Sequence, residues 1–441
     1  MTLLRRTWLR YLLVLVAISA TSVRADSQAF DRVDRAEVHE MLRNIARDVE
    51  NHYYDPQLHG LDWAARVREA HENIDKAGSI DDAAAEIAAL LDDLNDSHTV
   101  FYPPARPYWS DFGFLFQMIG DRCFVLEVGP GSDAEKKGLK RGDQVTSLNN
   151  LPLNRKTFWR IGYVYTFLHP PSSLQLNVIS VSGERRIVNL LARRVLSSHV
   201  RYHLAQGIHQ RILDSENGWE RIKPQEFEKG DDLLIVKLPH LGFSASEVDR
   251  ILGKMHKHGG VVLDLRGSQG GNRDTLERFL GGLFPNDLKI YDWHGRKETK
   301  SVSVKGRRDF AYTGRLAVLI DASSLATSEL FARVVQLERR GFILGDRSGG
   351  QVMEMKRYIY KAFADFDIPY SASITDADLI MTDGKSLEHV GVEPDIVMFP
   401  TVADLANNSD PVLAKAATLV GGHLTPAEAG ALFPFEWPRI D

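Results

Sequence analysis

The chain has 441 residues and carries 54 lysines and arginines against 59 aspartates and glutamates, a formal net charge of −5 at pH 7. An acidic chain without basic runs is a poor nucleic-acid binder. Its single cysteine, Cys123, has no partner for an intrachain disulfide, so stability must come from core burial. The length allows two to four domains at roughly 100–200 residues each.

The first 25 residues resemble a signal peptide. Arg5, Arg6 and Arg10 precede an apolar run over residues 11–18, and small residues lead up to Ala25. We expect cleavage after Ala25 and an exported protein, periplasmic or secreted. Cleavage takes away four arginines and no acidic residue, which changes the formal charge from −5 to −9. The alternative is an uncleaved anchor, but the run is shorter than the roughly 18 residues that span a bilayer. No later segment could span one.

Residues 26–107 are predicted to form a helical cap domain. Val38, Leu42, Ile45 and Val49 recur at helical spacing, and a second such pattern covers residues 85–94. No strand pattern interrupts them. The helical region ends in a turn-prone stretch, residues 95–98.

Residues 108–197 change to short strands and turns. Residues 129–143 combine a small helix, a Gly-Leu step and a Gly-Asp turn before a strand, and this stretch resembles the signature of PDZ domains. By that resemblance, the carboxylate-binding loop and strand would be Gly113, Phe114, Leu115 and Phe116, which would accept a peptide C-terminus by strand addition. A purely structural β-domain with a blocked groove is the alternative.

Residues 198–441 alternate strand and helix and end in a tail of short helices. This order predicts a largely parallel sheet with crossover helices, in which chemistry gathers at the carboxyl ends of strands. Ser328 follows one such end at the start of a helix, where free N–H groups would stabilise an oxyanion. Gly270 and Gly271 follow another and offer backbone that can come close to a substrate carbonyl. A capping hydroxyl and an ordinary turn are the alternative interpretation.

Five motifs then occur in one order. They are residues 96–99 (DSHT), the PDZ signature, residues 263–271 (LDLRGSQGG), residues 324–329 (SLATSE) and residues 388–395 (EHVGVEPD). Together they resemble the C-terminal processing (tail-specific) and tricorn-type serine peptidases over about residues 35–420. The resemblance implies a multidomain α/β protein with a helical cap, a PDZ-like β-rich domain and a ClpP/crotonase-like α/β catalytic domain.

The resemblance also suggests which residues would act. Family members with a Ser–Lys dyad carry lysine where this chain has Gln351, and an amide cannot accept the serine proton. The tricorn-type branch uses histidine instead. It implies Ser328 as nucleophile, His98 as general base, Ser97 orienting the imidazole and Glu388 anchoring Ser97. Because neighbouring residues of a strand point apart, Ser97 and His98 can serve one site only from a turn.

The implied oxyanion hole consists of backbone N–H groups of Glu329 and of Gly270 or Gly271. Asp264 and Arg266 are expected to stabilise the core through hydrogen bonds. We expect no cofactor and no metal: His199 and His203 are spaced for a helical metal clip but have no visible third ligand.

The expected function is that of an exported serine endopeptidase acting on peptides or unfolded protein tails, including protein C-termini, through an acyl-enzyme. Two alternatives stay open. One is a catalytically inactive protein on the same fold that binds peptides or lipophilic ligands. The other is an adaptor that captures peptides with its PDZ-like module alone.

Overall fold

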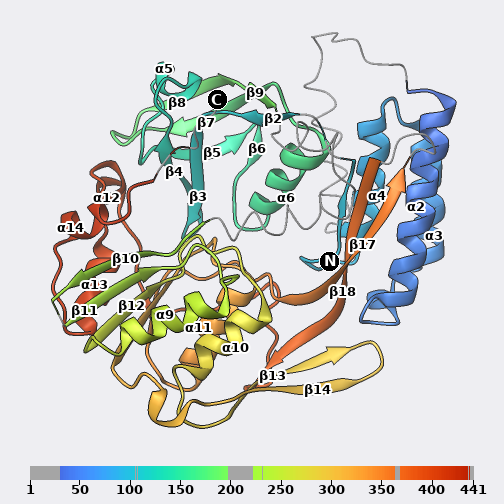
Figure 1. Ribbon diagram of the computed structural model, residues 1–441. Coiled ribbons are helices and arrows are strands. Elements are labelled where there is room, and N and C mark those ends of the chain that lie inside the picture. The colour runs from blue at the N-terminus through green and yellow to red at the C-terminus, as the bar shows by residue number, and fades with distance from the viewer. Residues whose placement is uncertain are drawn as a thin grey trace.

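The computed structural model describes residues 30–104, 106, 108–196, 222–230, 232–362, 368–435 and 437 (Figure 1). The expected signal segment and the pair His199 and His203 lie outside these residues. Within the described ranges, no helix combines the length and apolar character needed to cross a bilayer. The described residues form N-terminal helices, a β-rich sheet, a parallel sheet and a sheet that connects them.

The N-terminal region consists of three amphipathic helices, as predicted. Each begins at a side chain that accepts a backbone N–H, namely Asp31, Asp62 and Ser79. Their buried faces share one core, which includes Leu42 and Ile45. The elements are α2 (Arg32–His52), η1 (Leu58–Gly60), α3 (Trp63–Lys76) and α4 (Ile80–Asp92).

The following region is an antiparallel sheet in the order β3-β4-β5-β7-β8, with β6 beside β5. β3 therefore lies at an edge. Cys123 is buried in β4, and burial raises the pKa of its thiol, as suits a small core residue. The strands are β3 (Phe114–Ile119), β4 (Arg122–Val128), β5 (Gln144–Leu148), β6 (Leu151–Pro152), β7 (Ser173–Ile179) and β8 (Arg185–Leu191). Also in this region are α5 (Asp133–Lys136), α6 (Phe158–Tyr163), η2 (Val164–Leu168) and the pair β2 (Tyr108–Asp111) with β9 (Arg193–Leu196).

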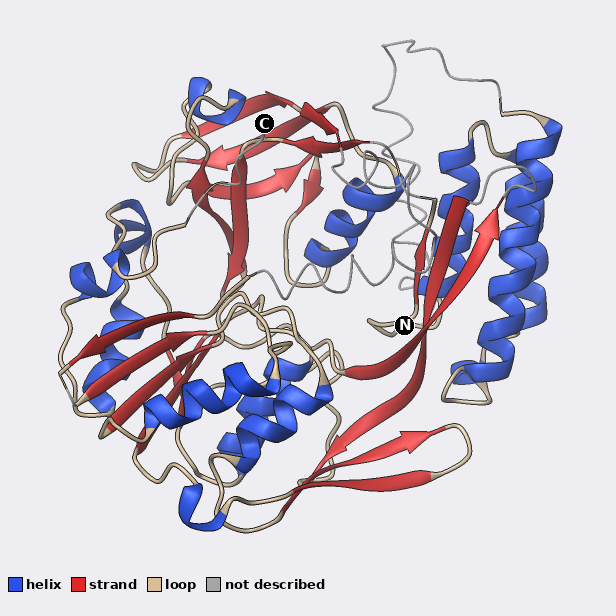
Figure 2. Cartoon of the chain, viewed as in Figure 1, coloured by secondary structure: helices blue, strands red, loops and turns tan. Residues whose placement is uncertain are grey.

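The parallel sheet has the order β10-β11-β12-β15-β16-β19, and only the β10–β11 pair is antiparallel. Along β11, Leu234 and Val236 pack towards α9, α10 and α11, whereas Leu233 and Ile235 pack towards α13. Helices therefore cover both faces of the sheet (Figure 2). The strands are β10 (Gln225–Lys229), β11 (Leu233–Lys237), β12 (Gly260–Asp264), β15 (Arg315–Ile320), β16 (Phe342–Gly345) and β19 (Ile396–Val397). The helices are α9 (Ala245–Met255), α10 (Arg273–Gly281), η4 (Arg308–Phe310), α11 (Thr327–Leu337), α12 (Val402–Ala406), α13 (Pro411–Leu419) and α14 (Pro426–Ala431).

A third sheet connects the N-terminal helices to this region. Its longest strand, β18 (Ile368–Met381), pairs with β1 (Val100–Tyr102), β17 (Met353–Ala362) and β13 (Leu288–Gly295), and β13 pairs with β14 (Thr299–Val304). β18 runs from the N-terminal helices to β13 (Figure 1). Because β1 begins just after His98, this pairing fixes the end of the helical region beside residues that follow far later in the chain.

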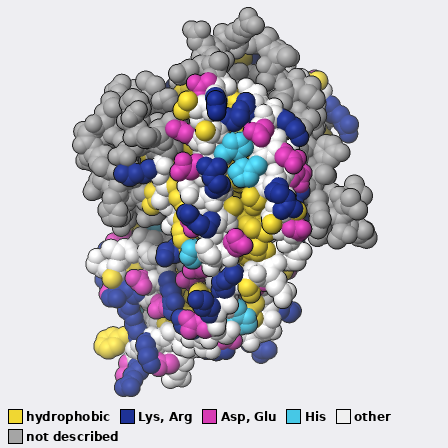
Figure 3. All heavy atoms as spheres, turned by 90° about the vertical axis from the view of Figure 1, so that its right-hand side faces the viewer, with side chains coloured by type: hydrophobic (Ala, Val, Ile, Leu, Met, Phe, Trp, Pro, Cys, Tyr) yellow, Lys and Arg dark blue, Asp and Glu magenta, His cyan; other side chains and the backbone are white. Residues whose placement is uncertain are grey.

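The face of the molecule over the N-terminal helices carries charges of both signs. Lysine and arginine side chains alternate there with aspartate and glutamate, without a continuous basic band (Figure 3). A mixed surface of this kind does not track a phosphate backbone.

Candidate active site

A turn ends the helical region and presents Ser97 and His98 together. Asn95 has a positive φ of 55°, and the carboxylate of the buried Asp96 accepts the N–H groups of His98 at 2.8 Å and Thr99 at 2.6 Å. The same oxygen accepts the hydroxyl of Thr375 in β18 at 2.7 Å. Asp96 therefore holds the backbone out of a regular strand, which allows adjacent side chains to face one another.

Ser97, His98 and Glu388 form one hydrogen-bonded chain. Glu388 accepts the N–H of Ser97 at 2.8 Å and its hydroxyl at 2.9 Å. The Ser97 hydroxyl lies 2.7 Å from Nδ1 of His98. Because the hydroxyl proton is directed at Glu388, the hydroxyl oxygen accepts from Nδ1–H. This tautomer leaves Nε2 of His98 unprotonated, as a general base requires.

Burial governs the charge states of His98 and Glu388 in this hydrogen-bonded trio. It lowers the pKa of His98, against the opposing effect of the Asp96 carboxylate. It raises the pKa of Glu388, and the nearby His389 acts in the opposite direction. His98 is therefore neutral near neutral pH.

The second half of the site is the turn between β15 and α11. Ala326 occupies it with φ 51° and ψ −117°, a sparsely populated conformation for a residue with a side chain. The turn faces the loop after β12, where Gly270 has φ 96°. A Cβ built on Gly270 would lie 3.0 Å from the Ala326 methyl group. The two loops therefore meet in direct contact at the carboxyl ends of their strands.

Ser328 lies behind this turn. Its side chain is 0% exposed, and its hydroxyl is 2.7 Å from the hydroxyl of Ser268. Among the hydrogen bonds of the described residues, none joins Ser328 to His98. The physical reason is helix geometry: α11 begins at Thr327, and the next side chain turns inwards against the loop after β12.

The expected oxyanion donors differ in whether their N–H groups already have a hydrogen-bond acceptor. The N–H of Glu329 donates to the carbonyl of Ala326 at 2.9 Å and is used within the turn. The carbonyls of Gly270 and Gly271 accept from Leu241 and from the Thr327 hydroxyl, respectively. Neither glycine N–H has a hydrogen-bond acceptor among the described residues, so these two remain the available donors.

The side chain of Glu329 is a structural element that sequence analysis missed. Its buried carboxylate accepts the Ser348 hydroxyl at 2.6 Å and the N–H groups of Gly350 at 2.7 Å, Gln351 at 3.0 Å and Ala326 at 3.0 Å. Burial raises its pKa to about 7, although these bonds act in the opposite direction. A glutamate three residues after a turn is the available signal, since that spacing is typical of a capping box.

Residues 351 and 352 connect the two halves. The carbonyl of Gln351 accepts the N–H of Ala326 at 3.0 Å. The next N–H, of Val352, donates to Glu388 at 2.8 Å. One peptide unit therefore separates the α11 turn from the carboxylate that orients Ser97 and His98.

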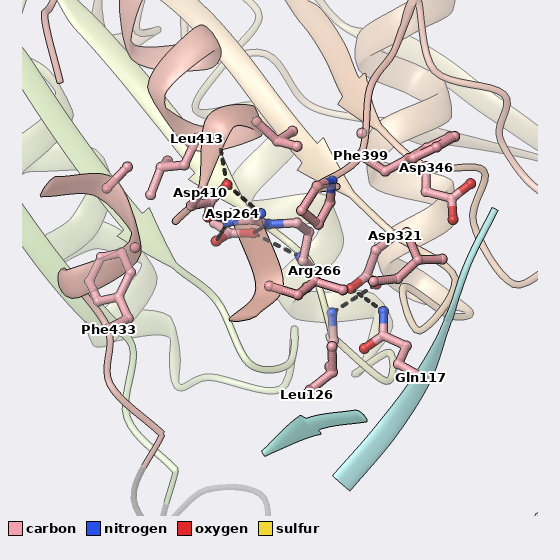
Figure 4. Close-up of a pocket in the computed structure, with 18 of the residues that line it drawn as sticks. Gln117, Leu126, Asp264, Arg266, Asp321, Asp346, Phe399, Asp410, Leu413 and Phe433 are labelled. Atoms are coloured by element: carbon pink, nitrogen blue, oxygen red, sulfur yellow. Dashed lines mark hydrogen bonds and ion pairs between the residues drawn. The ribbon is translucent and has the colours of Figure 1, made fainter. Parts of the chain in front are cut away.

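A groove of about 480 Å³ lies on the other side of the loop after β12 (Figure 4). It is lined by residues that include Leu115 and Gln117 of β3, Gly267 and Asp321. Gln117 donates to Asp321 at 2.6 Å. The groove connects the edge strand of the β-rich sheet with the loop that carries Gly270.

Asp264 and Arg266 form an ion-pair network beside this groove. Arg266 donates to Asp264 at 2.8 Å and to Asp410 at 2.7 Å (Figure 4). Burial opposes ionisation of Asp264, but the charge of Arg266 brings its pKa below the usual range. Both side chains hold the core, as expected.

The expected carboxylate-binding loop is partly occupied. The N–H of Gly113 donates to the carboxylate of Asp111 at 2.9 Å. Phe114 stacks on Phe116, which packs edge to face on Phe158 of α6. Leu115 is 38% exposed and points to the groove. Strand addition along β3 therefore fits this arrangement better than carboxylate capture at Gly113.

The described residues contain no cluster of three metal-binding side chains.

Comparisons with known proteins give a consistent picture. Residues 232–398 match the model of peptidase family S41, and residues 34–82 match the tricorn protease C1 domain. The tail-specific protease of Haemophilus influenzae is 28% identical over 332 residues, covering 70% of this chain and 44% of its own length. The chloroplastic C-terminal processing peptidase of Tetradesmus obliquus is 22% identical over 391 residues, covering 81% of this chain and 76% of that one.

A solved structure shares the fold. The crystal structure of mature CPAF superposes with a TM-score of 0.63 at 14% identity, covering 85% of this chain and 94% of that one. The chain spans less than half the length of the tail-specific protease.

Proposed function

Because the chain belongs to peptidase family S41 and is a serine-type peptidase of that family, we propose that it acts on peptides or unfolded protein tails. The place of action is the junction of the α11 turn, the Gly270 loop and the chain Glu388–Ser97–His98. The observation that carries the proposal is this chain of hydrogen bonds, which leaves a neutral imidazole with Nε2 as acceptor. Such an imidazole can take a proton from an attacking hydroxyl.

The proposed reaction is peptide-bond hydrolysis through an acyl-enzyme. A hydroxyl oxygen attacks the carbonyl carbon, its proton passes to His98, and the N–H groups of Gly270 and Gly271 stabilise the oxyanion. The C–N bond then breaks as His98 gives this proton to the departing amine, and water, deprotonated by His98, releases the acyl group as a carboxylic acid and restores the hydroxyl. Ser328 can supply this oxygen only after its hydroxyl leaves Ser268 and the turn opens. We therefore expect hydrolysis by the chain to be slow.

A substrate path is supported by the groove beside β3. An extended peptide that adds to the edge of β3 would run along Leu115 and Gln117 towards the loop after β12. Backbone pairing of this kind selects unfolded segments over folded ones, because only an extended chain offers a free row of N–H and C=O groups. We also propose export, on the strength of the basic and apolar residues 5–18; N-terminal sequencing of the protein from cells would test it.

A second candidate function is peptide binding without hydrolysis. It is favoured by the complete burial of the Ser328 hydroxyl. Labelling with a fluorophosphonate, read by intact mass, separates the two. A slow single adduct that S328A abolishes supports hydrolysis through Ser328. A folded, unlabelled chain that still binds fluorescein-labelled casein supports binding alone, and failure to bind casein would contradict both.

A further inference from the structure

The residue that occupies the strained turn of the site is an alanine. Two bonds from its N–H, to Gln351 and to the Glu329 carboxylate, and two to its carbonyl, from Glu329 and Leu330, fix Ala326 in its unusual conformation. Strain of this kind costs about 1–3 kcal/mol and persists only where the surroundings over-determine it. A methyl group makes no polar contact that would offset this strain. The reason for the strained turn must therefore be the direction in which it points the side chain.

The direction of this side chain supplies that reason. The Ala326 methyl group lies on the side of Gly270 where a side chain would be, 3.0 Å from the position of a Cβ built there, and the loop of Gly270 has two available N–H donors. Ala326 is partly exposed, whereas Ser328 is 0% exposed. In hydrolases with a strained strand-to-helix turn, that turn lifts one side chain above the sheet edge towards the oxyanion donors. In this chain, position 326 occupies such a turn.

Position 326 is also the one tied to the proton-accepting half of the site. Its N–H binds the Gln351 carbonyl, and the adjacent Val352 N–H binds Glu388, which holds Ser97. Ser328 takes part in no such connection: its hydroxyl binds Ser268 in the interior.

We infer that position 326, at which this chain carries only a methyl group, is the reactive position of the site, so that the natural chain holds peptides far better than it cleaves them. The inference rests on the proposed peptide site and adds what limits its turnover. A hydroxyl at this position would complete the machinery already present: the donors at Gly270 and Gly271 and the base His98.

The test installs that hydroxyl with A326S and measures fluorophosphonate labelling. In the expected step the new hydroxyl gives its proton to His98 as its oxygen bonds to phosphorus, and the P–F bond breaks with departure of fluoride. A326S should be labelled at least about 10²-fold faster than the natural chain, with the adduct mapped to position 326. H98A added to A326S should remove most of that gain.

A403S is the matched control, since it adds the same hydroxyl at an exposed alanine of α12, outside the turn, and should stay at the natural rate. Equal labelling of the natural chain and A326S, or rapid labelling of Ser328 in the natural chain, would overturn the inference. So would a folded A326S that stays unlabelled. If A326S does not fold, A326C offers a second route: its thiol should react with iodoacetamide faster than the buried Cys123, and H98A should slow it.

Casein binding separates this inference from the proposed function. A labelled A326S that neither binds nor cleaves casein would keep the inference and contradict the proposed substrate class. Casein binding by an A326S variant that resists labelling would contradict the inference alone.

Discussion

The N–H of Ala326 donates to the carbonyl of Gln351 at 3.0 Å, and this bond joins the turn before α11 to the segment ahead of β17 that binds Glu388. Gln351 occupies the position at which family members with a Ser–Lys dyad carry the lysine. In this chain that position contributes to the site through its backbone. Gln351 supports the turn through its carbonyl, a role open to any residue type. We therefore expect Gln351→Ala to leave fluorophosphonate labelling of A326S within about twofold, because only a side-chain role would be lost; a tenfold loss would indicate that the amide takes part.

Replacing Glu329 tests whether its carboxylate holds the turn. Glu329→Gln loses acceptor capacity for four donors and should lower the free energy of unfolding by about 1–3 kcal/mol. Urea unfolding measures it. Glu338→Gln, at the exposed end of the same helix, is the control and should change stability by less than about 0.5 kcal/mol. Equal effects of the two changes would show that the buried carboxylate does not hold the turn.

The same residue predicts a pH dependence. Its pKa of about 7 in the folded chain lies above the usual 4.5, so the folded state binds more protons between these values. The contribution of Glu329 to stability should therefore fall as pH rises from about 5 to about 8. The difference in unfolding free energy between the natural chain and Glu329→Gln should shrink over this range. A difference that grows with pH would contradict the raised pKa.

His98 should stay neutral to lower pH than a free histidine. Burial lowers its pKa below 6.5, so the folded chain resists a proton that the unfolded chain takes up, and this contribution to stability is lost as pH falls below 6.5. Nitrogen-15 NMR of the imidazole should show the Nδ1–H tautomer at pH 7 and a midpoint under 6.5. Ser97→Ala should shift the Nδ1 signal. A midpoint above 6.5 would contradict the neutral base.

Ser328 and Ser268 should behave as a structural pair. Removing either hydroxyl leaves the other buried without its partner and should cost about 1–3 kcal/mol, while the double change to alanine should cost less than the sum. Thermal or urea unfolding of the double-mutant cycle measures the coupling. Additive effects would argue that the two hydroxyls do not interact.

Arg266 should matter far more than a surface arginine. Arg266→Met leaves the buried Asp264 without its counter-charge and should destabilise the chain by about 3–5 kcal/mol. Arg250→Met is the control: its partners, Glu226 and Glu247, form a more exposed network, and the change should cost under about 1 kcal/mol. Urea unfolding compares them. A small effect at Arg266 would mean that solvent already screens the pair.

The alternation of strand and helix after residue 230 could be predicted from the sequence, because buried parallel strands are continuous apolar runs. The turn at Asp96 could also be predicted, because the residue types at 95–98 favour a turn. The third sheet could not be predicted in the same way. β14 is largely exposed and polar, and it joins the sheet through β13, whose other partner, β18, lies far later in the chain.

The choice among residues 326–328 was beyond sequence reasoning for a different reason. A shift of two residues in where a helix begins decides which side chain faces the loop and which enters the core. The sequence pattern of this segment fits several starting points for the helix, and the serine hydroxyl favours Ser328 as the predicted nucleophile. Only the positive φ of Ala326 and the burial of Ser328 show which side chain points to Gly270.

We expect peptides to bind where the α11 turn meets the Gly270 loop and His98. Photo-crosslinking of the natural chain with a benzophenone-bearing unfolded peptide, mapped by mass spectrometry, locates the bound peptide. Adducts should form in residues 267–272 and at the turn around Ala326, and excess unlabelled casein should suppress them. Adducts confined to surfaces remote from this junction, such as β8 or α3, would contradict this expectation.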